Sequence, residues 1–212
     1  MEQLEFNKTT KLLEKYKLPY AKSKLVNSLD KAVKAAKEIS YPVVLKIISK
    51  DIIHKSDIKG IMFADDEDEL ISSFEKLEKI AKRKKAKLDG ILIQKKESGK
   101  EVIVGMKHDS QFGPVILFGL GGVFVELMKD VSFRIAPIDK KEAEAMIDEI
   151  RSSEILKGFR GESPVKISAL TDILVKVSNL SMKEKKILEI DFNPIIIDEK
   201  SAKIADARVM VE

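Results

Sequence analysis

The chain has 212 residues, of which 44% are hydrophobic and 35% charged, with a formal net charge of +4. This balance is typical of a folded globular protein and excludes a disordered chain. The absence of cysteine excludes disulfides and thiolate metal sites. Glycine, proline or charge interrupts each long apolar run, which excludes a membrane span. Residues 1–16 lack the apolar core of a secretory signal, so we expect a cytoplasmic protein.

The positive charge is spread along the chain. Its densest cluster, residues 82–87 (KRKKAK), closes a segment that opens with the acidic residues 65–69 (DDEDE). Acid at the start and base at the end are what a helix macrodipole favours. We therefore interpret the cluster as helix-end charge on a solvated face and expect no nucleic-acid partner.

The first part of the chain alternates between helical and strand patterns. Apolar side chains recur at helical spacing in three segments, 4–16, 28–40 and 66–87. Short runs rich in β-branched residues predict strands at 22–28, 41–48 and 60–64. A polar loop, residues 50–60, separates the last two strands.

The second part predicts strands in quick succession. Turn residues separate five runs, 89–96, 100–109, 114–120, 123–129 and 131–138. Helices are predicted at 139–150, where Asp139 and Glu142 form a capping box, and at 165–180. Two final strands are predicted at 186–198 and 202–211. The fold class is therefore α+β, with lobes at 1–96 and 97–212 and a largely antiparallel sheet in the second.

Lys46 lies inside the apolar strand pattern VVLKI. A buried lysine costs free energy unless its ammonium group meets an anion, so one interpretation is contact with nucleotide phosphates. The other is a lysine that extends from a half-exposed strand to solvent. The strand pattern alone leaves both open.

A glycine-rich turn, residues 119–122 (GLGG), joins two apolar segments. Closely spaced glycines allow backbone N–H groups to approach a phosphate. The spacing fits neither a P-loop nor a dinucleotide fingerprint. A tight hairpin turn is the alternative and the more frequent explanation.

Oxygen-bearing side chains recur at every second position of the strand 186–198. Glu189, Asp191 and Asn193 project to one face, and Asp206 on the next strand can supply another oxygen. Mg²⁺ favours such ligands, usually shared with nucleotide phosphates. The alternative is a solvated face with Asn193-Pro194 ending the strand.

Three further residues have both a chemical and a structural interpretation. Arg134 in an apolar strand can stabilise a transferring phosphoryl group, or form a structural ion pair. Glu101 can accept ribose hydroxyls, or be a solvated strand-end acid. His54 in the loop DIIHKSDIKG can be a nucleophile, or simply a solvated loop histidine.

Several long motifs occur together and in a fixed order: YPVVLKIIS, IIHKSDIKG, FGPVILFGLGGVFVELMKDVSFRIAPI, RGE and EIDFNPIII with ADAR. They cover nearly the whole chain. In order and spacing the chain resembles the ATP-grasp domain of ADP-forming acyl-CoA (acetyl-CoA) synthetases, above all their archaeal beta subunits. Succinyl-CoA synthetase beta chains are more distant relatives.

The resemblance implies a single ATP-grasp domain, 1–212, with the nucleotide held between two sheets. It implies that acyl-CoA, ADP and phosphate are converted to carboxylic acid, CoA and ATP. The cofactors implied are ATP or ADP and Mg²⁺. The partner implied is an alpha subunit that binds CoA, in a hetero-oligomer such as α2β2, because this chain lacks a G-x-G-x-x-G coenzyme A segment.

The resemblance also implies a role for each candidate residue. His54 carries the phosphoryl group to ADP, and Arg134 lies where that group is handled. The nucleotide is held by Lys46, Gln94, Lys95, Lys96, Glu101, Gly119, Gly121 and Gly122. The magnesium ligands are Asn193 and Asp206, with Asp191 beside them.

The chain departs from the family pattern at Lys59, where a glycine is common, and at Lys166, where an acid is frequent. Neither position is a proposed ligand. Two other functions stay open: an ATP-grasp carboxylate–amine ligase, which needs no phosphohistidine, and a non-catalytic nucleotide-sensing module.

Overall fold

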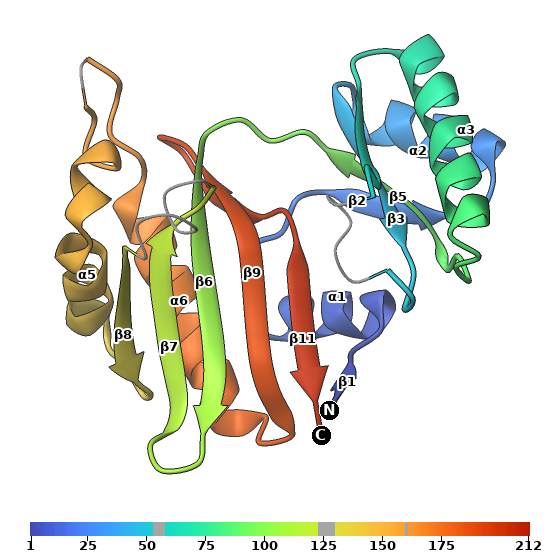
Figure 1. Cartoon of the computed structure of the whole chain (residues 1–212). Coiled ribbons are helices and arrows are strands. Elements are labelled where there is room, and N and C mark those ends of the chain that lie inside the picture. The colour runs from blue at the N-terminus through green and yellow to red at the C-terminus, as the bar shows by residue number, and fades with distance from the viewer. Residues whose placement is uncertain (53–57, 123–129, 160) are drawn as a thin grey trace. The chain divides into compact units, whose positions relative to one another are not determined.

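The structure is a computed structural model that describes residues 1–52, 58–122, 130–159 and 161–212 (Figure 1). Its contacts divide the chain into two compact units. Unit 1 comprises Met1–Tyr20 and Glu97–Glu212, and unit 2 comprises Ala21–Lys96. The chain therefore leaves unit 1 after Tyr20 and returns to it at Glu97.

Unit 2 is a four-stranded antiparallel sheet with two helices. The sheet has the order β2-β5-β3-β4. Its elements are β2 (Ser23–Val26), α2 (Leu29–Ile39), β3 (Val43–Ile48), β4 (Ile61–Ala64), α3 (Glu67–Arg83) and β5 (Gly90–Lys95).

Strand β3 carries apolar side chains on both faces, and only one face joins the main core of unit 2. Val43, Leu45 and Ile47 are fully buried in the cluster that includes the apolar sides of α2 and α3. Side chains alternate along a strand, so Val44 and Lys46 project to the face opposite the two helices. Lys46 therefore does not enter the helix-covered core.

Unit 1 is built on a seven-stranded sheet in which neighbouring strands pair antiparallel. The main path runs β1-β11-β9-β6-β7-β8, and β10 pairs with β9. The strands are β1 (Glu2–Gln3), β6 (Lys100–Asp109), β7 (Gly113–Leu120), β8 (Val131–Ile135), β9 (Ile187–Ile197), β10 (Ala202–Ile204) and β11 (Ala207–Val211). The helices are α1 (Phe6–Lys15), α5 (Lys140–Glu149), the short 3₁₀ helix η1 (Arg151–Ile155) and α6 (Ile167–Lys183).

Helices cover one face of this sheet. Figure 1 shows α6 running behind β6 and β7, and the core contains side chains of α5 and α6 together with Val104, Ile116 and Phe192 of the sheet. We call this the helix face and the opposite side the open face. The predicted capping box is confirmed: Asp139 accepts from the Glu142 N–H at 2.9 Å, and Glu142 accepts from the Asp139 N–H at 3.0 Å.

The N-terminal helix does not belong with the rest of the lobe expected at 1–96. The Leu4 N–H donates to the Val209 carbonyl at 2.8 Å, and Leu13 and Leu18 are buried in the core of unit 1. The contacts thus divide the chain after Tyr20 and after Lys96, and they group the first 20 residues with unit 1.

The final strand expected at 202–211 is two strands. Pro194 offers no N–H to a neighbour, and the N–H groups of Ala205 and Asp206 both donate to its carbonyl, at 2.9 and 3.3 Å. Two residues thus oppose one, and pairing is interrupted between β10 and β11. The strand expected at 123–129 lies outside the described residues. In the described part of the chain, no helix is long and apolar enough to cross a membrane.

Candidate functional site

The strand registers show which candidate residues share a face of the unit 1 sheet. Residues paired directly across antiparallel strands project to the same side. One row of paired residues contains buried core side chains, and the next row contains Asp191. The helix-face row is Ile190, Met106, Ile116 and Arg134, and the open-face row is Asp191, Gly105, Leu117 and Phe133.

The three proposed metal ligands lie close together where β9 faces the interruption between β10 and β11. Asp191 is half-buried on the open face, and Asn193 is exposed. The Asn193 N–H donates to the Asp206 carbonyl at 3.2 Å, which places Asp206 directly beside it. Among the described residues no three His, Cys, Asp or Glu side chains form a metal cluster. Two carboxylates and an amide fit Mg²⁺ that takes its remaining ligands from phosphate and water.

Glu101 and the glycine turn meet on the same sheet. The Gly121 N–H donates to the Glu101 carbonyl at 2.7 Å. A side chain at Gly121 would place its Cβ 2.9 Å from the Glu101 Cβ, so only glycine fits there without displacement. Gly122 has φ +68°, which also favours glycine. The turn and the proposed ribose acid are therefore one local structure at the end of β7.

Gly119 has a structural reason of its own. Its Cβ would lie 2.9 Å from the Val131 Cγ1 and 3.0 Å from the Asp130 carbonyl oxygen. This glycine lets β8 pair closely with β7. The predicted glycine turn thus combines a packing role at Gly119 with an open backbone at Gly121 and Gly122.

Asp130 holds the start of β8 and was not expected from the sequence. Its carboxylate accepts from the backbone N–H groups of Arg151 and Ser152, both at 2.8 Å, and from the Ser152 hydroxyl. Burial alone would raise the pKa of Asp130, but these hydrogen bonds outweigh it and hold the pKa below its usual value. Asp130 thus joins β8 to η1 next to the glycine turn.

We expect Asp130→Asn to lower the free energy of unfolding at pH 7 by about 1–3 kcal/mol, since an amide cannot accept all three bonds. A lowered folded-state pKa stabilises the protein above the unfolded value of 3.8 and ceases to do so as pH falls through the folded value. The difference between variant and wild type should therefore shrink below pH 3.8. Denaturant unfolding at a series of pH values measures it; a difference independent of pH would contradict the assignment.

Arg134 does not join the metal-binding group. It pairs with Ile116 on the helix face, whereas Asp191 belongs to the open face. Its guanidinium donates to Glu149 of α5 at 2.6 Å and to the Phe133 carbonyl at 2.7 Å. The ion pair with Glu149 is the structural alternative considered for Arg134, and its role with the transferring phosphate stays a prediction.

In unit 2 the structure brings Lys46 and Gln94 together. Val44 pairs with Gln94 and Lys46 pairs with Leu92, so the two polar side chains are diagonal neighbours on the face opposite α2 and α3. Both are buried, at 6% and 5% exposed. A lysine and an amide on one apolar strand surface suit recognition of a polar, anionic ligand.

Lys95 and Lys96 have different environments from Gln94. The Lys95 ammonium donates to the carbonyls of Ser40 and Tyr41, at 3.0 Å each, beyond the end of α2. The Lys96 ammonium lies 3.6 Å from Asp65 and 5.4 Å from the centre of the Phe63 ring. Lys95 thus fixes the end of its own strand, and its side chain is already engaged.

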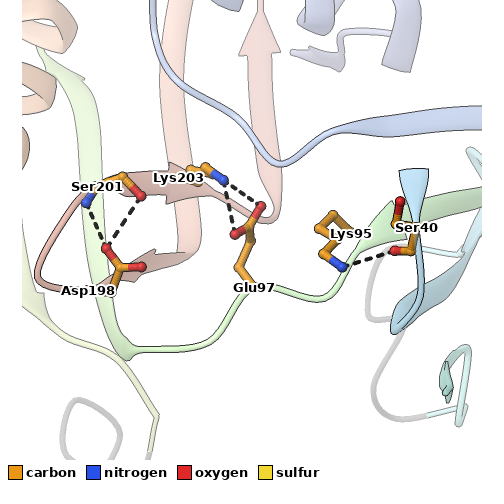
Figure 2. A network of polar contacts seen from close by, with 6 residues as sticks. All are labelled: Ser40, Lys95, Glu97, Asp198, Ser201 and Lys203. Carbon is orange, nitrogen blue, oxygen red and sulfur yellow. Dashed lines mark hydrogen bonds and ion pairs between the residues drawn. The ribbon is translucent and has the colours of Figure 1, made fainter. Parts of the chain in front are cut away.

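The chain is anchored on each side of the crossing at Lys96. Figure 2 shows the Lys95 contact with Ser40 in unit 2 and the Glu97 contact with Lys203 in unit 1. Lys203 donates to both carboxylate oxygens of Glu97, at 3.0 and 3.1 Å. The segment 94–96, which the resemblance assigns to nucleotide binding, therefore ends where unit 1 begins.

The candidate residues form two groups, one in each unit. The group in unit 1 consists of Glu101, Gly121, Gly122, Asp191, Asn193 and Asp206, and the group in unit 2 consists of Lys46, Gln94 and Lys96. His54 lies outside the described residues.

Nearly the whole chain matches one known domain family. The ATP-grasp domain family matches residues 1–211. The chain is an ATP-grasp protein. The expected fold is thereby confirmed, and it agrees with the antiparallel sheets of both units.

Two curated relatives narrow the family. The beta subunit of ADP-forming acetate–CoA ligase I of Pyrococcus furiosus is 47% identical over 204 residues, which cover 94% of this chain and 88% of the relative. The ADP-forming acetate–CoA ligase I of Archaeoglobus fulgidus is 45% identical over 203 residues, which cover 94% of this chain and 30% of the relative. This ATP-grasp chain belongs with the beta subunits of that ligase family and spans under a third of the A. fulgidus relative.

Solved structures agree with this family. Acetyl-coenzyme A synthetase 1 of Ca. Korarchaeum cryptofilum, in complex with coenzyme A, Ca-AMPCP and HgCl⁺, superposes with a TM-score of 0.95 at 39% identity, over 100% of this chain and 94% of that one. PH1788 of Pyrococcus horikoshii superposes with a TM-score of 0.92 at 40% identity, over 100% of this chain and 92% of that one.

Arg208 is a charged residue on the open face to which sequence reasoning gave no role. It pairs directly with Asp191 and donates to Glu189 at 2.6 Å. The ADAR motif contained the signal, because Arg208 follows Asp206 by two positions and therefore shares its side of an extended strand.

Proposed function

We propose that this chain is the nucleotide-binding beta subunit of an ADP-forming acyl-CoA synthetase, which converts acyl-CoA, ADP and phosphate to carboxylic acid, CoA and ATP. One observation carries the proposal. The open face of the unit 1 sheet gathers Glu101, the glycine turn and the set Asp191, Asn193 and Asp206, in a chain 47% identical to a beta subunit of such a ligase.

Each group has a role in holding the nucleotide. Glu101 accepts hydrogen bonds from ribose hydroxyls, and the backbone of Gly121 and Gly122 approaches phosphate without side-chain obstruction. The hard oxygens of Asp191, Asn193 and Asp206 suit Mg²⁺, which neutralises phosphate charge when bound.

Unit 2 supplies further residues proposed to bind the nucleotide. Lys46 contacts phosphate as a point charge. Backbone carbonyls of residues 94–96 accept a hydrogen bond from the adenine amino group, because the N–H groups of Lys95 and Lys96 already donate to the carbonyls of Lys22 and Pro42, at 2.8 and 3.1 Å. The Lys95 and Lys96 side chains also have protein partners. Buried Gln94 lies at the same end of β5.

His54 carries the phosphoryl group. Its neutral imidazole nitrogen accepts the group from the phosphohistidine that the resemblance implies on the partner subunit, and a new N–P bond forms as the donor's N–P bond breaks and its electron pair returns to the donor ring. A terminal ADP oxygen then attacks phosphorus, a P–O bond forms, and the N–P electron pair returns to the ring. Support comes from the histidine loop and from a related K. cryptofilum structure whose phosphohistidine segment points towards the nucleotide-binding site.

The partner is an alpha subunit that binds CoA. The region similar to this chain makes up 30% of the longer A. fulgidus relative. The P. furiosus relative is a separate beta subunit. We propose a hetero-oligomer of the α2β2 type in which the alpha subunit carries the acyl site.

The isolated chain is expected to bind Mg·ADP and to form no acetyl-CoA until an alpha subunit is added. Calorimetric titration with Mg·ADP, followed by an assay of acetyl-CoA formation from acetate, CoA and ATP with and without the P. furiosus alpha subunit, measures both properties. Full activity of the isolated chain, or failure to bind nucleotide, would overturn the proposal. Nucleotide binding without turnover after addition of the alpha subunit would favour a sensing module.

A further inference from the structure

Arg208 lies at the centre of the charged part of the open face. Arg208 of β11 pairs with Asp191 of β9. On its other side, Asp191 pairs with Gly105 of β6. Side chains paired in this way have Cβ atoms about 5 Å apart. Asp191 is therefore flanked by a guanidinium on one side and by a residue without a side chain on the other.

The guanidinium of Arg208 is held in place but not fully used. Nη2 donates to the Glu189 carboxylate at 2.6 Å, with Arg208 35% and Glu189 25% exposed. Nε is buried and has no hydrogen-bond partner. Guanidinium has five donors, and a buried unpaired donor is costly. If Arg208 served only to stabilise the fold, its Nε donor would not need to remain without a partner next to a carboxylate.

The charges on this face are unequal. Three carboxylates, Glu189, Asp191 and Asp206, lie on neighbouring positions of β9 and of the segment entering β11. The cations beside them are Arg208 and, across from Glu189 on β6, Lys107. Arg208 is the cation paired with the proposed metal ligand, and Glu189 fixes its position.

We propose that Arg208, anchored by Glu189, is a positioning residue of the metal site. It holds the Asp191 carboxylate in place and makes the site select a metal–nucleotide complex over a free divalent cation. The cation Arg208 repels a bare M²⁺ ion but attracts the net-negative complex of that ion with ADP. This inference rests on the proposed function and adds a residue to it.

The directions in which two affinities change in a variant test this role. Arg208→Gln is expected to bind free Mn²⁺ roughly threefold to tenfold more tightly and Mn·ADP roughly threefold to tenfold more weakly, from one unit charge removed about 5–8 Å away. Electron paramagnetic resonance of unbound Mn²⁺ measures the first affinity, and calorimetry with Mn·ADP the second. Loss of structure alone would weaken both, so weakening of both overturns the proposal, as does no change in either.

Glu189→Gln keeps Arg208 but removes the opposite charge, so it is expected to weaken free Mn²⁺ binding and to strengthen Mn·ADP binding. This variant keeps the proposal falsifiable if Arg208→Gln does not fold. Lys107→Gln is the matched control, because it removes one positive charge that is not paired with Asp191, and its expected effects stay under about twofold. Equal effects of Lys107→Gln and Arg208→Gln would overturn the proposal.

Different results would overturn the proposed function and the role of Arg208. Wild-type protein that binds no Mn·ADP overturns both the proposed function and the role of Arg208. Wild-type protein that binds Mn·ADP, with an Arg208→Gln variant that weakens both ligands, overturns the role of Arg208 alone.

Discussion

Replacement of His54 by asparagine is expected to reduce acyl-CoA synthesis by at least about a thousandfold, since the amide cannot form the covalent phosphoryl intermediate. Binding of Mg·ADP should stay within about twofold of wild type, because the proposed nucleotide ligands lie elsewhere in the chain. Incubation with γ-³²P-labelled ATP and the alpha subunit, followed by mapping of acid-labile label, measures the transfer directly.

His108 provides the control for this experiment. It is an exposed residue of β6 that pairs with Pro114, and we assign it no chemistry. His108→Asn should therefore retain label and turnover. Undiminished turnover in His54→Asn would instead indicate direct formation of an acyl phosphate, as in a carboxylate–amine ligase.

Local structure was predictable because its causes are local. The capping box of Asp139 and Glu142 lies within four residues, and the helix of 28–40 follows from apolar spacing alone. Membership in a unit was not predictable, since it depends on distant contacts. The helix of Leu13 packs in the core of unit 1, next to strands that lie almost 200 residues later in the chain.

The side to which a strand residue points relative to the covering helices is another long-range property. Alternation correctly grouped Asp191 with Asn193, because both lie on one strand. It could not place Arg134 relative to them, since that depends on pairing across β6, β7 and β8. The ion pair with Glu149 follows from that pairing and from the position of α5.

The residues proposed to recognise phosphate were identified mainly by resemblance. An apolar strand with one lysine is compatible with solvent exposure or with ligand contact, and the buried position of Lys46 rejects the simple solvated alternative. Asp130 gave no signal, because its partners Arg151 and Ser152 are 21 and 22 residues away in a different element.

Asp206→Asn is expected to weaken Mg·ADP binding by at least about tenfold, because a hard cation loses a charged ligand while the side chain keeps its size. The position of Asp206 supports this choice: the hydrogen bond from the Asn193 N–H to its carbonyl holds the backbones of the two proposed ligands together. That bond does not use the carboxylate. The carboxylate accepts from the Ala207 N–H at 3.1 Å, and the amide oxygen of asparagine can accept the same bond, so the variant should keep its fold. Calorimetric titration at saturating Mg²⁺ and at several lower Mg²⁺ concentrations measures the loss.

Asp198→Asn separates metal binding from turn stability on the same hairpin. Asp198 accepts from the N–H groups of Lys200 and Ser201, at 2.8 and 2.7 Å, and Figure 2 shows its contact with Ser201. The Lys200 bond is the main cause that lowers the pKa of Asp198. We therefore expect Asp198→Asn to lower Tm by about 2–4 °C and to leave Mg·ADP affinity unchanged, whereas Asp206→Asn does the reverse. If both variants lost affinity in proportion to Tm, Asp206 would be a structural residue and the metal site would lie elsewhere.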